Sequence, residues 1–534
     1  MKLFCLTLLC SLSTLCFSQS NKFSFKTGSE YTLPRNTEDL AFLGNEQDGI
    51  INLSLKKDEM IIVRFDPKTL NSTSEKVIKL PETTKNFNSE IAIDFNSNYY
   101  WLHSDWDKKN ETESLSYTKL DAVTGRISEE NHLMFESEKM AGEYNPVGYT
   151  SNKTTNKYQF NFDAENKKLL VSYRLYPEFK NDKKNYDKIG LQVFDENLNK
   201  IWGNVFTMPY TEQIMDNSDF SIDAKGNAYM LAKVYDSDSR KERDKSTGAP
   251  AYHYEVLKFS KDSKRIIIAK ITVDDYFIKE TSLVENSLHE MIIACTYSKK
   301  LKGNGTDGIF LARLDQDGKV INYKKGYYEF PLSELQKFES ARSKRKMDRK
   351  DDYEIPNLKV RSITIEKDGG VLIACEEYHY EVTTRTSGAT GMTYSSTIYY
   401  YGDILAAKID TKGDFQWLRK IPKNQVGGAG RGTMSFKLIT DESGYYFLYL
   451  DNLKNKNLSE DEVPKTHVDG FGGQVMVSKI DKTGNITKEL LFDTREEEIM
   501  IFPSFFDRIN GNQFIGRAQL KKKRMYKPIL ITVN

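Results

Sequence analysis

This sequence has few of the residues and motifs that assign a function directly. Its 534 residues include only five cysteines and six histidines. It contains no G-x-S-x-G, no H-E-x-x-H and no cysteine pair at zinc-binding spacing. These absences weaken the case for a hydrolase or a zinc site without excluding an enzyme, because folding can bring distant residues together. We therefore name no catalytic residue and expect no metal and no cofactor.

Long apolar runs are also absent after residue 17. Lys2 is followed by the apolar run 3–17 and then by Ser18, a pattern typical of a secretory signal peptide over residues 1–18. Lipid attachment at Cys16 is the alternative, but Leu15 before it is larger than the residue that such processing prefers. We expect an exported chain, residues 19–534, that does not span a membrane.

Neither sign of charge is in excess. The chain has 77 basic and 76 acidic residues, and removal of residues 1–18 would take away only Lys2. Nucleic-acid binding requires a basic bias, so we expect no nucleic-acid partner. Of the cysteines, Cys295 and Cys375 lie outside the signal peptide. They are interpreted as small core residues, with a disulfide between neighbouring units as the alternative.

What the sequence does contain is a recurring strand–turn–strand unit. It is clearest in residues 404–417, ILAAKIDTKGDFQW, where alternating apolar residues lead to an aspartate, a glycine and a tryptophan. Alternation predicts a half-buried strand, and Asp and Gly suit a tight hairpin turn. Each unit follows another apolar segment, and an eighth such segment begins at Gln513. The other matching stretches begin at Ile61, Tyr117, Leu191, Val256, Leu311 and Val477.

Repeats of this kind are typical of β-propellers. We predict an all-β protein, a single β-propeller of eight four-stranded blades across residues 19–534. The last unit lacks an outer strand, and residues 23–34 end in the apolar–proline pair that ends several other units. Residues 23–34 are therefore predicted to complete the last blade and to close the ring. Seven blades is the alternative, if the unit near Val256 is irregular.

The long connections are predicted to share one face of the ring. Strands of a blade alternate in direction, so the connections between second and third strands emerge beside those that join one blade to the next. One of the latter, 331–356, is predicted to be a short helical insertion with Ser333 and Gln336 as a capping box. Its basic half, 342–350, is either a solvated helix or a contact for an anionic surface. The long connections within blades are 176–188, 236–251, 377–402 and 452–473.

The connection 377–402 holds most of the candidate binding residues. Tyrosine provides a large, rigid and amphipathic contact surface, which is why it concentrates in binding sites. The alternative is a long hairpin that extends beyond its blade, which would itself be able to bind. Arg431, in the glycine-rich stretch 427–432, is a candidate anion contact, with a flexible loop as the alternative. The candidates in 377–402 are Tyr378, His379, Tyr380, Tyr394, Tyr399, Tyr400 and Tyr401.

Two resemblances follow from these motifs. The units DENLNKIW, 195–202, and DTKGDFQW, 410–417, resemble the repeat of quinoprotein-like propellers, in which the tryptophan, here Trp202 and Trp417, packs between blades. Residues 368–425, with DGGVLIACEEYHYEVTTRT, YYYGDILAAKID and WLRKIPKNQ, resemble an uncharacterised secreted β-propeller family of Bacteroidota. That resemblance implies an exported propeller of a Gram-negative envelope and transfers no catalytic residue. No sorting domain of the type IX route follows the last predicted blade, so we expect the periplasm rather than the cell exterior.

The sequence thus favours a non-enzymatic binding or scaffold module whose long-loop face engages an envelope protein, peptide or glycan. The alternative is a hydrolase or lyase that gathers acids, histidines and tyrosines at the mouth of the central channel. A third hypothesis is a quinone or metal site. The sequence makes no prediction about the oligomeric state.

Overall fold

The computed structural model describes residues 22–534 except 81–85, 148–150, 180–181, 272–274, 316, 351–352, 387–390, 429–433, 469–471 and 522–523. The predicted signal peptide and Arg431 therefore lie outside the described residues.

Strands dominate the described residues and form eight sheets of four or more strands, here numbered 1 to 8 in chain order, with two further two-stranded sheets. Within each four-stranded meander, neighbouring strands are antiparallel, as predicted from the repeats. The unit near Val256 forms a complete four-stranded sheet, sheet 4.

Sheet 1 comprises β3 (Glu38–Asn45), β4 (Gly49–Lys56), β5 (Glu59–Phe65) and β6 (Ser72–Lys79), and sheet 2 comprises β7 (Asn88–Phe95), β8 (Asn98–Asp107), β9 (Thr112–Asp121) and β10 (Arg126–Ser137). Sheet 3 comprises β13 (Tyr158–Phe162), β14 (Lys168–Arg174), β15 (Tyr186–Asp195) and β16 (Lys200–Thr211). Sheet 4 comprises β17 (Met215–Ile222), β18 (Ala228–Tyr235), β19 (Tyr252–Ser260) and β20 (Ser263–Ile271). Sheet 5 comprises β21 (Phe277–Glu285), β22 (Met291–Ser298), β24 (Gly308–Leu314) and β25 (Val320–Glu329). Sheet 6 comprises β27 (Leu358–Ile365), β28 (Val371–Thr386), β29 (Thr393–Ile409), β30 (Phe415–Ile421), β31 (Gln425–Gly428) and β34 (His467–Val468). Sheet 7 comprises β32 (Phe436–Asp441), β33 (Gly444–Asp451), β35 (Gln474–Asp481) and β36 (Ile486–Asp493). Sheet 8 comprises β37 (Ile499–Ile501), β38 (Asp507–Asn510), β39 (Gln513–Leu520), β40 (Met525–Val533), β1 (Phe23–Thr27) and β2 (Tyr31–Thr32), and the two-stranded sheets are β11 (Glu143–Val147) with β12 (Ser151–Thr155) and β23 (Gly305–Thr306) with β26 (Ile355–Pro356).

In sheets 1, 2, 3, 5, 6 and 7, the aspartate of the repeat caps the turn after the third strand. In sheet 6, Asp410 Oδ1 accepts hydrogen bonds from the backbone N–H of Lys412 and Asp414, at 2.9 and 2.8 Å. Gly413 has φ +80°, a left-handed conformation that glycine adopts without steric cost. The recurring Asp and Gly are therefore structural, as the turn chemistry predicted.

The core is divided among the spaces between sheets. Seven clusters of buried apolar side chains are each shared by two sheets that are neighbours in the series, and an eighth is shared by sheets 8 and 1. All residues of β33 are buried, whereas the outer strand β6 is largely exposed. The second strand of a unit reads as a continuous apolar run because its sheet is packed on both faces.

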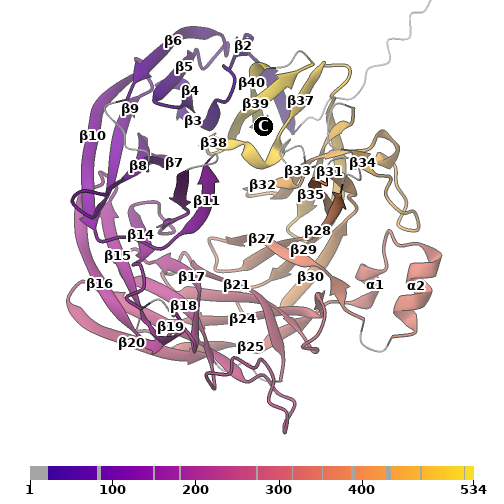
Figure 1. Ribbon diagram of the computed structural model, residues 1–534. Helices are drawn as coiled ribbons and strands as arrows, with labels where there is room; N and C mark the ends of the chain where they lie inside the picture. Colours follow the sequence, from indigo (N-terminus) through magenta and orange to yellow (C-terminus); the bar gives the residue numbers. More distant parts are fainter. Residues whose placement is uncertain are drawn as a thin grey trace, which may run out of the picture.

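The sheets follow one another around a common centre, with the C-terminal strands beside the N-terminal ones, an arrangement that is a β-propeller (Figure 1). The strand β1 pairs along its whole length with β40, from Phe23 opposite Val533 to Thr27 opposite Ile529. Sheet 8 also packs on sheet 1, because Ile515 and Ile50 share one cluster.

The insertion 331–356 holds two helices rather than one, α1 (Leu332–Leu335) and α2 (Ala341–Asp348). Phe338, between them, has φ +61°, which a continuous helix does not allow. In the described part of the chain, neither α-helix approaches the length and apolarity that a membrane crossing needs.

The predicted capping box is wrong. Ser333 lies inside α1, whose N-cap position is Pro331 and has no side-chain cap. The cap is instead Ser340, whose Oγ accepts a hydrogen bond from Ser343 N at 3.1 Å at the start of α2. The sequence signal was misplaced because α1 begins at Leu332, directly after Pro331, so Ser333 already lies in its first turn and not at the N-cap position.

The two tryptophans of the quinoprotein-like motif do lie between sheets. Trp202 of sheet 3 donates its indole N–H to the carbonyl of Gly226 in sheet 4, at 2.8 Å. Trp417 of sheet 6 donates to Lys482 O in sheet 7, at 3.3 Å. Each indole therefore joins two consecutive sheets.

The two cysteines are free and buried, in different apolar clusters. The alternative of a disulfide between them is therefore wrong for this structure.

Candidate binding surface

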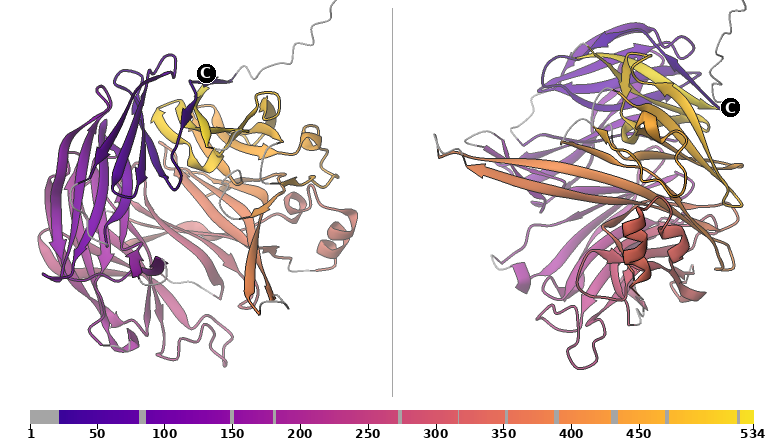
Figure 2. Two further views of the ribbon diagram at one scale, coloured as in Figure 1. Left: turned by 45° about the horizontal axis from the view of Figure 1, so that its top comes forward. Right: turned by 90° about the vertical axis from the view of Figure 1, so that its right-hand side faces the viewer.

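The stretch 377–402 forms a long hairpin and not an irregular loop. β28 and β29 run past the other strands of sheet 6, and their paired ends project from the body of the protein (Figure 2). Six of the predicted residues lie in pairs: Tyr378 opposite Tyr401, His379 opposite Tyr400, and Tyr380 opposite Tyr399. The alternative of an extended hairpin is thus what the structure contains.

One face of this hairpin carries four of the predicted tyrosines, which we call the tyrosine face. Alternation along paired strands places Tyr378, Tyr380, Tyr399 and Tyr401 on the same side. The ring centroids are 4.9 Å apart for Tyr378 and Tyr401, and 6.0 Å apart for Tyr380 and Tyr399. The guanidinium of Arg361, from β27, lies 4.9 Å from the Tyr378 ring centre. Tyr380 is 59% exposed, so the outer end of the tyrosine face is open to a partner.

The opposite face differs in character. His379 stacks on Tyr400, with ring centroids 4.5 Å apart and an interplanar angle of 4°. Tyr400 donates its hydroxyl to Glu381 at 3.1 Å, and this hydrogen bond raises the pKa of Tyr400. By the register, Tyr394 lies on this face too, opposite Arg385. The predicted residues are therefore brought onto one hairpin but divided between two faces.

A cavity of about 520 Å³ lies where the tyrosine face meets sheet 5. Tyr378 and Tyr380 line it together with Lys279, Asn304 and Asn357. The amide of Asn304 donates to Asn357 Oδ1 at 3.1 Å. The cavity is also lined by an ion pair, Lys359 with Glu280. Aromatic rings, amides and charges thus converge at the base of the hairpin, a combination typical of ligand pockets.

Buried ion pairs hold the base of the hairpin in place. Glu376, the residue before the projecting part, is fully buried between Lys423 Nζ at 2.7 Å and Arg361 Nε at 2.8 Å. Ser435 donates to the same carboxylate at 2.9 Å. Lys423 also donates to Tyr401 O at 3.2 Å. Because buried charges are stable only when paired, these contacts fix the hairpin against β30 and the chain beyond it.

A second buried lysine connects the hairpin to the helical insertion. Lys420 Nζ lies 3.0 Å from Asp403 Oδ2 and 2.9 Å from Glu339 Oε1, and it donates to Leu335 O at 3.1 Å. Burial raises the pKa of Asp403, and burial together with that carboxylate raises the pKa of Glu377. The insertion is thus linked through Lys420 to the base of the hairpin.

Sequence reasoning missed this support entirely. The signal was present as two acidic residues directly after an apolar strand, Glu376 and Glu377, and as two lysines in the stretch KIPKN, Lys420 and Lys423. Charged residues at strand ends are usually solvated, so only the tertiary structure shows that these four lie together.

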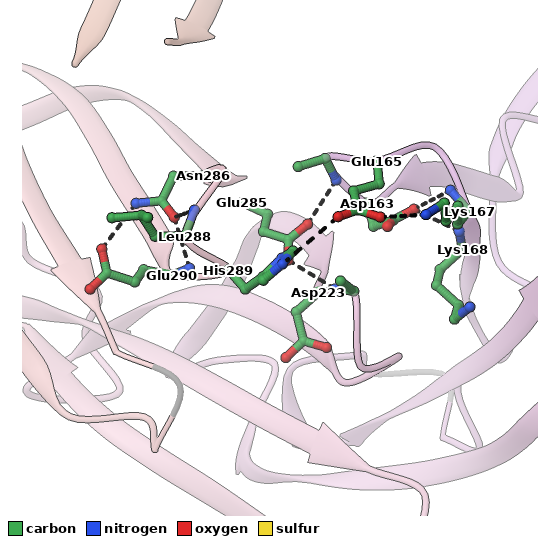
Figure 3. Close-up of polar contacts among 12 residues, drawn as sticks. Asp163, Glu165, Lys167, Lys168, Asp223, Glu285, Asn286, Leu288, His289 and Glu290 are labelled. Carbon is green, nitrogen blue, oxygen red and sulfur yellow. Dashed lines mark hydrogen bonds and ion pairs between the residues drawn. The ribbon is translucent and has the colours of Figure 1, made fainter. Parts of the chain in front are cut away.

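A separate polar cluster lies at the turns between first and second strands, on the face opposite the hairpin. Glu285, at the end of β21, points into the junction of three turns (Figure 3). Its Oε2 accepts from Ala164 N at 2.7 Å, and its Oε1 accepts from Ala224 N at 2.8 Å. These donors belong to sheets 3 and 4, so one buried carboxylate joins three consecutive sheets.

His289 is part of the same cluster. Its Nδ1 lies 3.0 Å from Glu285 Oε1, and its Nε2 lies 4.0 Å from Glu165 Oε1. Burial raises the pKa of Glu285, while the backbone and histidine contacts lower it in part. Because both oxygens of Glu285 accept hydrogen bonds from backbone N–H groups, the main role of the carboxylate is to hold the turns in position.

The chain has no match among protein-family models or among curated proteins. Among solved structures it is similar to a Dos1 propeller, with 9% identity, a TM-score of 0.42 and coverage of 95% of this chain and 94% of the other. It is also similar to the β-propeller domain of the Trilobed protease from Pyrococcus furiosus, with 10% identity, a TM-score of 0.34 and coverage of 86% and 97%. A polysaccharide lyase, an ulvan lyase, has 10% identity, a TM-score of 0.35 and coverage of 82% and 90%. These similarities are too distant to assign a function or a blade count to this chain.

Proposed function

We propose that the protein is an exported, non-enzymatic binding or scaffold module that holds a protein, peptide or glycan on the tyrosine face. The observation that carries the proposal is a projecting hairpin whose tyrosine face is half-buried at its base and exposed at Tyr380, anchored by buried ion pairs and continuous with a cavity of about 520 Å³. We further propose that the chain belongs with the secreted propellers of Bacteroidota that residues 368–425 resemble, and that it works in the periplasm.

The buried ion pairs at the base of the hairpin favour a binding role, because they hold the tyrosine face rigid. An anchored aromatic surface loses little conformational freedom when a partner docks, so more of the contact energy remains as affinity. Tyrosine rings stack on sugar faces and on peptide side chains, while Asn304, Asn357 and Lys279 supply donors at one end of the surface. A chain-like ligand would contact both the tyrosine face and the cavity.

We also propose that the eight sheets form a closed ring of eight blades. The contact between sheets 8 and 1 supports this: Phe42 N donates to Asp507 Oδ2 at 2.9 Å, beside the apolar cluster that the two sheets share. A closed ring protects sheet edges and gives the hairpin a rigid platform.

The test compares residues 19–534 with a variant that carries Tyr380→Ala and Tyr399→Ala. The probes are a glycan array, a library of extended peptides and an envelope extract, followed by titration calorimetry on each ligand found. We expect affinity to fall by about tenfold or more, since truncating an aromatic anchor typically costs more than about 1 kcal/mol. Tyr394→Ala, on the opposite face, is the matched control and should bind normally. Absence of binding to every probe, or equal losses in both variants, would contradict the proposal.

The alternative function is a hydrolase or lyase near the channel mouth. The observation that favours it is His289, one third exposed and oriented by the buried Glu285, an arrangement that can serve a general base. Turnover of polysaccharide or peptide substrates that disappears in His289→Gln, with the fold intact, would favour the enzyme over the binding module.

A further inference from the structure

The outer edge of β28 has no partner beyond the base of the hairpin. β27 pairs with β28 only as far as Leu358 opposite Glu377, and the backbone N–H of Tyr378 then donates to Asn357 O at 2.8 Å. From residue 379 to residue 386, β28 pairs with β29 on one side and with no other strand in the part of the chain that the structure describes. This edge is eight residues long, about 26 Å at the usual rise per residue.

The two edges of the hairpin are unequal. The outer edge of β29 pairs with β31 over four residues, from Tyr401 opposite Gln425 to Ile398 opposite Gly428, whereas β28 has no outer partner from residue 379 onward in the described part of the chain. On the β28 side, the side chains from residue 381 to residue 386 are all exposed. An exposed strand edge presents unpaired backbone groups that accept another strand, and natural proteins usually shorten or cover such an edge. Here it is left open on a projecting element (Figure 2).

The side chains of this edge are complementary to themselves. If two copies pair antiparallel about Thr383, Glu381 of each copy lies directly opposite Arg385 of the other. Val382 then lies opposite Thr384, and all facing residues share a side of the sheet, because the pairing preserves the alternation. Directly opposed residues of opposite charge stabilise an antiparallel pair, whereas other registers lose these contacts. The charges that discourage random pairing therefore favour this register.

We infer that the β28 edge binds a second copy of this chain and forms a four-stranded sheet across a twofold axis. The axis is perpendicular to the sheet, as antiparallel edge pairing of identical strands requires. The added strand continues the line of β27, and the cavity of about 520 Å³ lies at that end of the edge.

The dimer has a consequence for binding. A twofold axis perpendicular to the sheet leaves the tyrosine faces of both copies on the same side. A partner with repeated epitopes then meets two adjacent tyrosine faces, and the second contact is formed at high effective concentration. The inference itself concerns the edge and not the face, so it stands independently of the proposed function.

The edge alone is smaller than a standard protein interface, so we expect a dissociation constant in the micromolar range. Sedimentation equilibrium on residues 19–534, from about 1 to about 100 µM, should give a mass that rises from monomer to dimer. A chain that stays monomeric throughout this range would overturn the inference.

Charge exchange tests the register. Glu381→Arg alone and Arg385→Glu alone each place like charges opposite each other twice, and each should weaken the dimer by about tenfold or more. The double variant Glu381→Arg with Arg385→Glu restores both pairs and should dimerise again. A mixture of the two single variants should form a heterodimer for the same reason. Lys264→Glu, on the exposed strand β20, is the charge control.

Cross-linking tests the position of the axis. Thr383→Cys places two thiols opposite each other at a distance that a disulfide spans, whereas Val382→Cys separates them by two residues along the strand. The native cysteines are buried and do not compete. We expect an intermolecular disulfide under mild oxidation with Thr383→Cys only. Equal cross-linking of both variants, or single charge variants that dimerise like the native chain, would overturn the inference.

Discussion

Replacement of Glu376 by glutamine should loosen the hairpin more than any change on its surface. The substitution removes the carboxylate charge beside Lys423, whose side chain is fully buried and would keep only neutral acceptors, among them Tyr401 O and Gln425 Oε1 at 3.2 and 3.3 Å. Breaking one partner of a buried ion pair costs about 3–5 kcal/mol, and these two acceptors place the expected cost at about 3 kcal/mol.

The reverse substitution, Lys423→Met, should cost less. Glu376 would keep Arg361 at 2.8 Å and the Ser435 hydroxyl at 2.9 Å, so its charge remains paired. We expect about 1–2 kcal/mol, close to the loss of a charged hydrogen bond. The double variant, Glu376→Gln with Lys423→Met, removes the unpaired ammonium of Lys423 and should be more stable than Glu376→Gln alone.

Hydrogen exchange of the amides of β28 and β29 measures the loss of hairpin stability in each variant directly, because it reports the free energy of local opening. A cost of about 3 kcal/mol corresponds to exchange that is more than a hundredfold faster. Exchange in sheet 2, which does not contact sheet 6 through a shared apolar cluster, is the internal control. If the two single effects simply add in the double variant, the assignment of the cost to an unpaired Lys423 is refuted.

Three further outcomes follow from the structure. Burial by itself would raise the pKa of Glu366, but hydrogen bonds from Lys408, Lys482 and Tyr445 lower it to about 2. The ionised carboxylate therefore stabilises the folded protein at pH values above its unfolded pKa of about 4.3, and this stabilisation is lost as the pH falls toward 2. Glu366→Gln should accordingly flatten the dependence of the melting temperature on pH between about pH 5 and pH 3. Replacing Glu285 by alanine leaves the N–H groups of two neighbouring turns without an acceptor, and thermal unfolding should show a loss of about 2–4 kcal/mol, against less than about 0.5 for the exposed control Glu165→Ala. Burial raises the pKa of the Cys375 thiol to about 12, so a thiol reagent should modify it only after denaturation, and rapid labelling of the native protein would show that the sheet is open there.

The strand units could be predicted from residue patterns because their determinants are local. In residues 404–417, alternation, Asp410 and Gly413 each act within a few residues, and the structure has the predicted strand, turn and strand. The position of the helix cap was mispredicted, although capping is also local. Ser333 satisfied the pattern, but the helix begins one residue earlier, after Pro331, and the side-chain cap is found instead at Ser340 of the next helix.

The candidate surface was predictable only in part. The tyrosines were found because their density in 377–402 is unusual, and alternation would have separated the two faces once a hairpin was assumed. The anchoring of the hairpin was not predictable, because Glu376 and Lys423, which form a buried ion pair at its base, lie nearly fifty residues apart in sequence.

By itself, the sequence determined the class of the protein: an all-β chain of repeated units with Asp-capped turns, whose stability rests on buried apolar strands and not on cysteines. Each of these properties depends on neighbours along the chain. The tertiary structure alone decided that β1 joins β40, that Glu285 connects three sheets and that one edge of β28 stays open. These features arise from contacts between residues far apart in sequence, whose cost in chain entropy is recovered only when the sheets pack together.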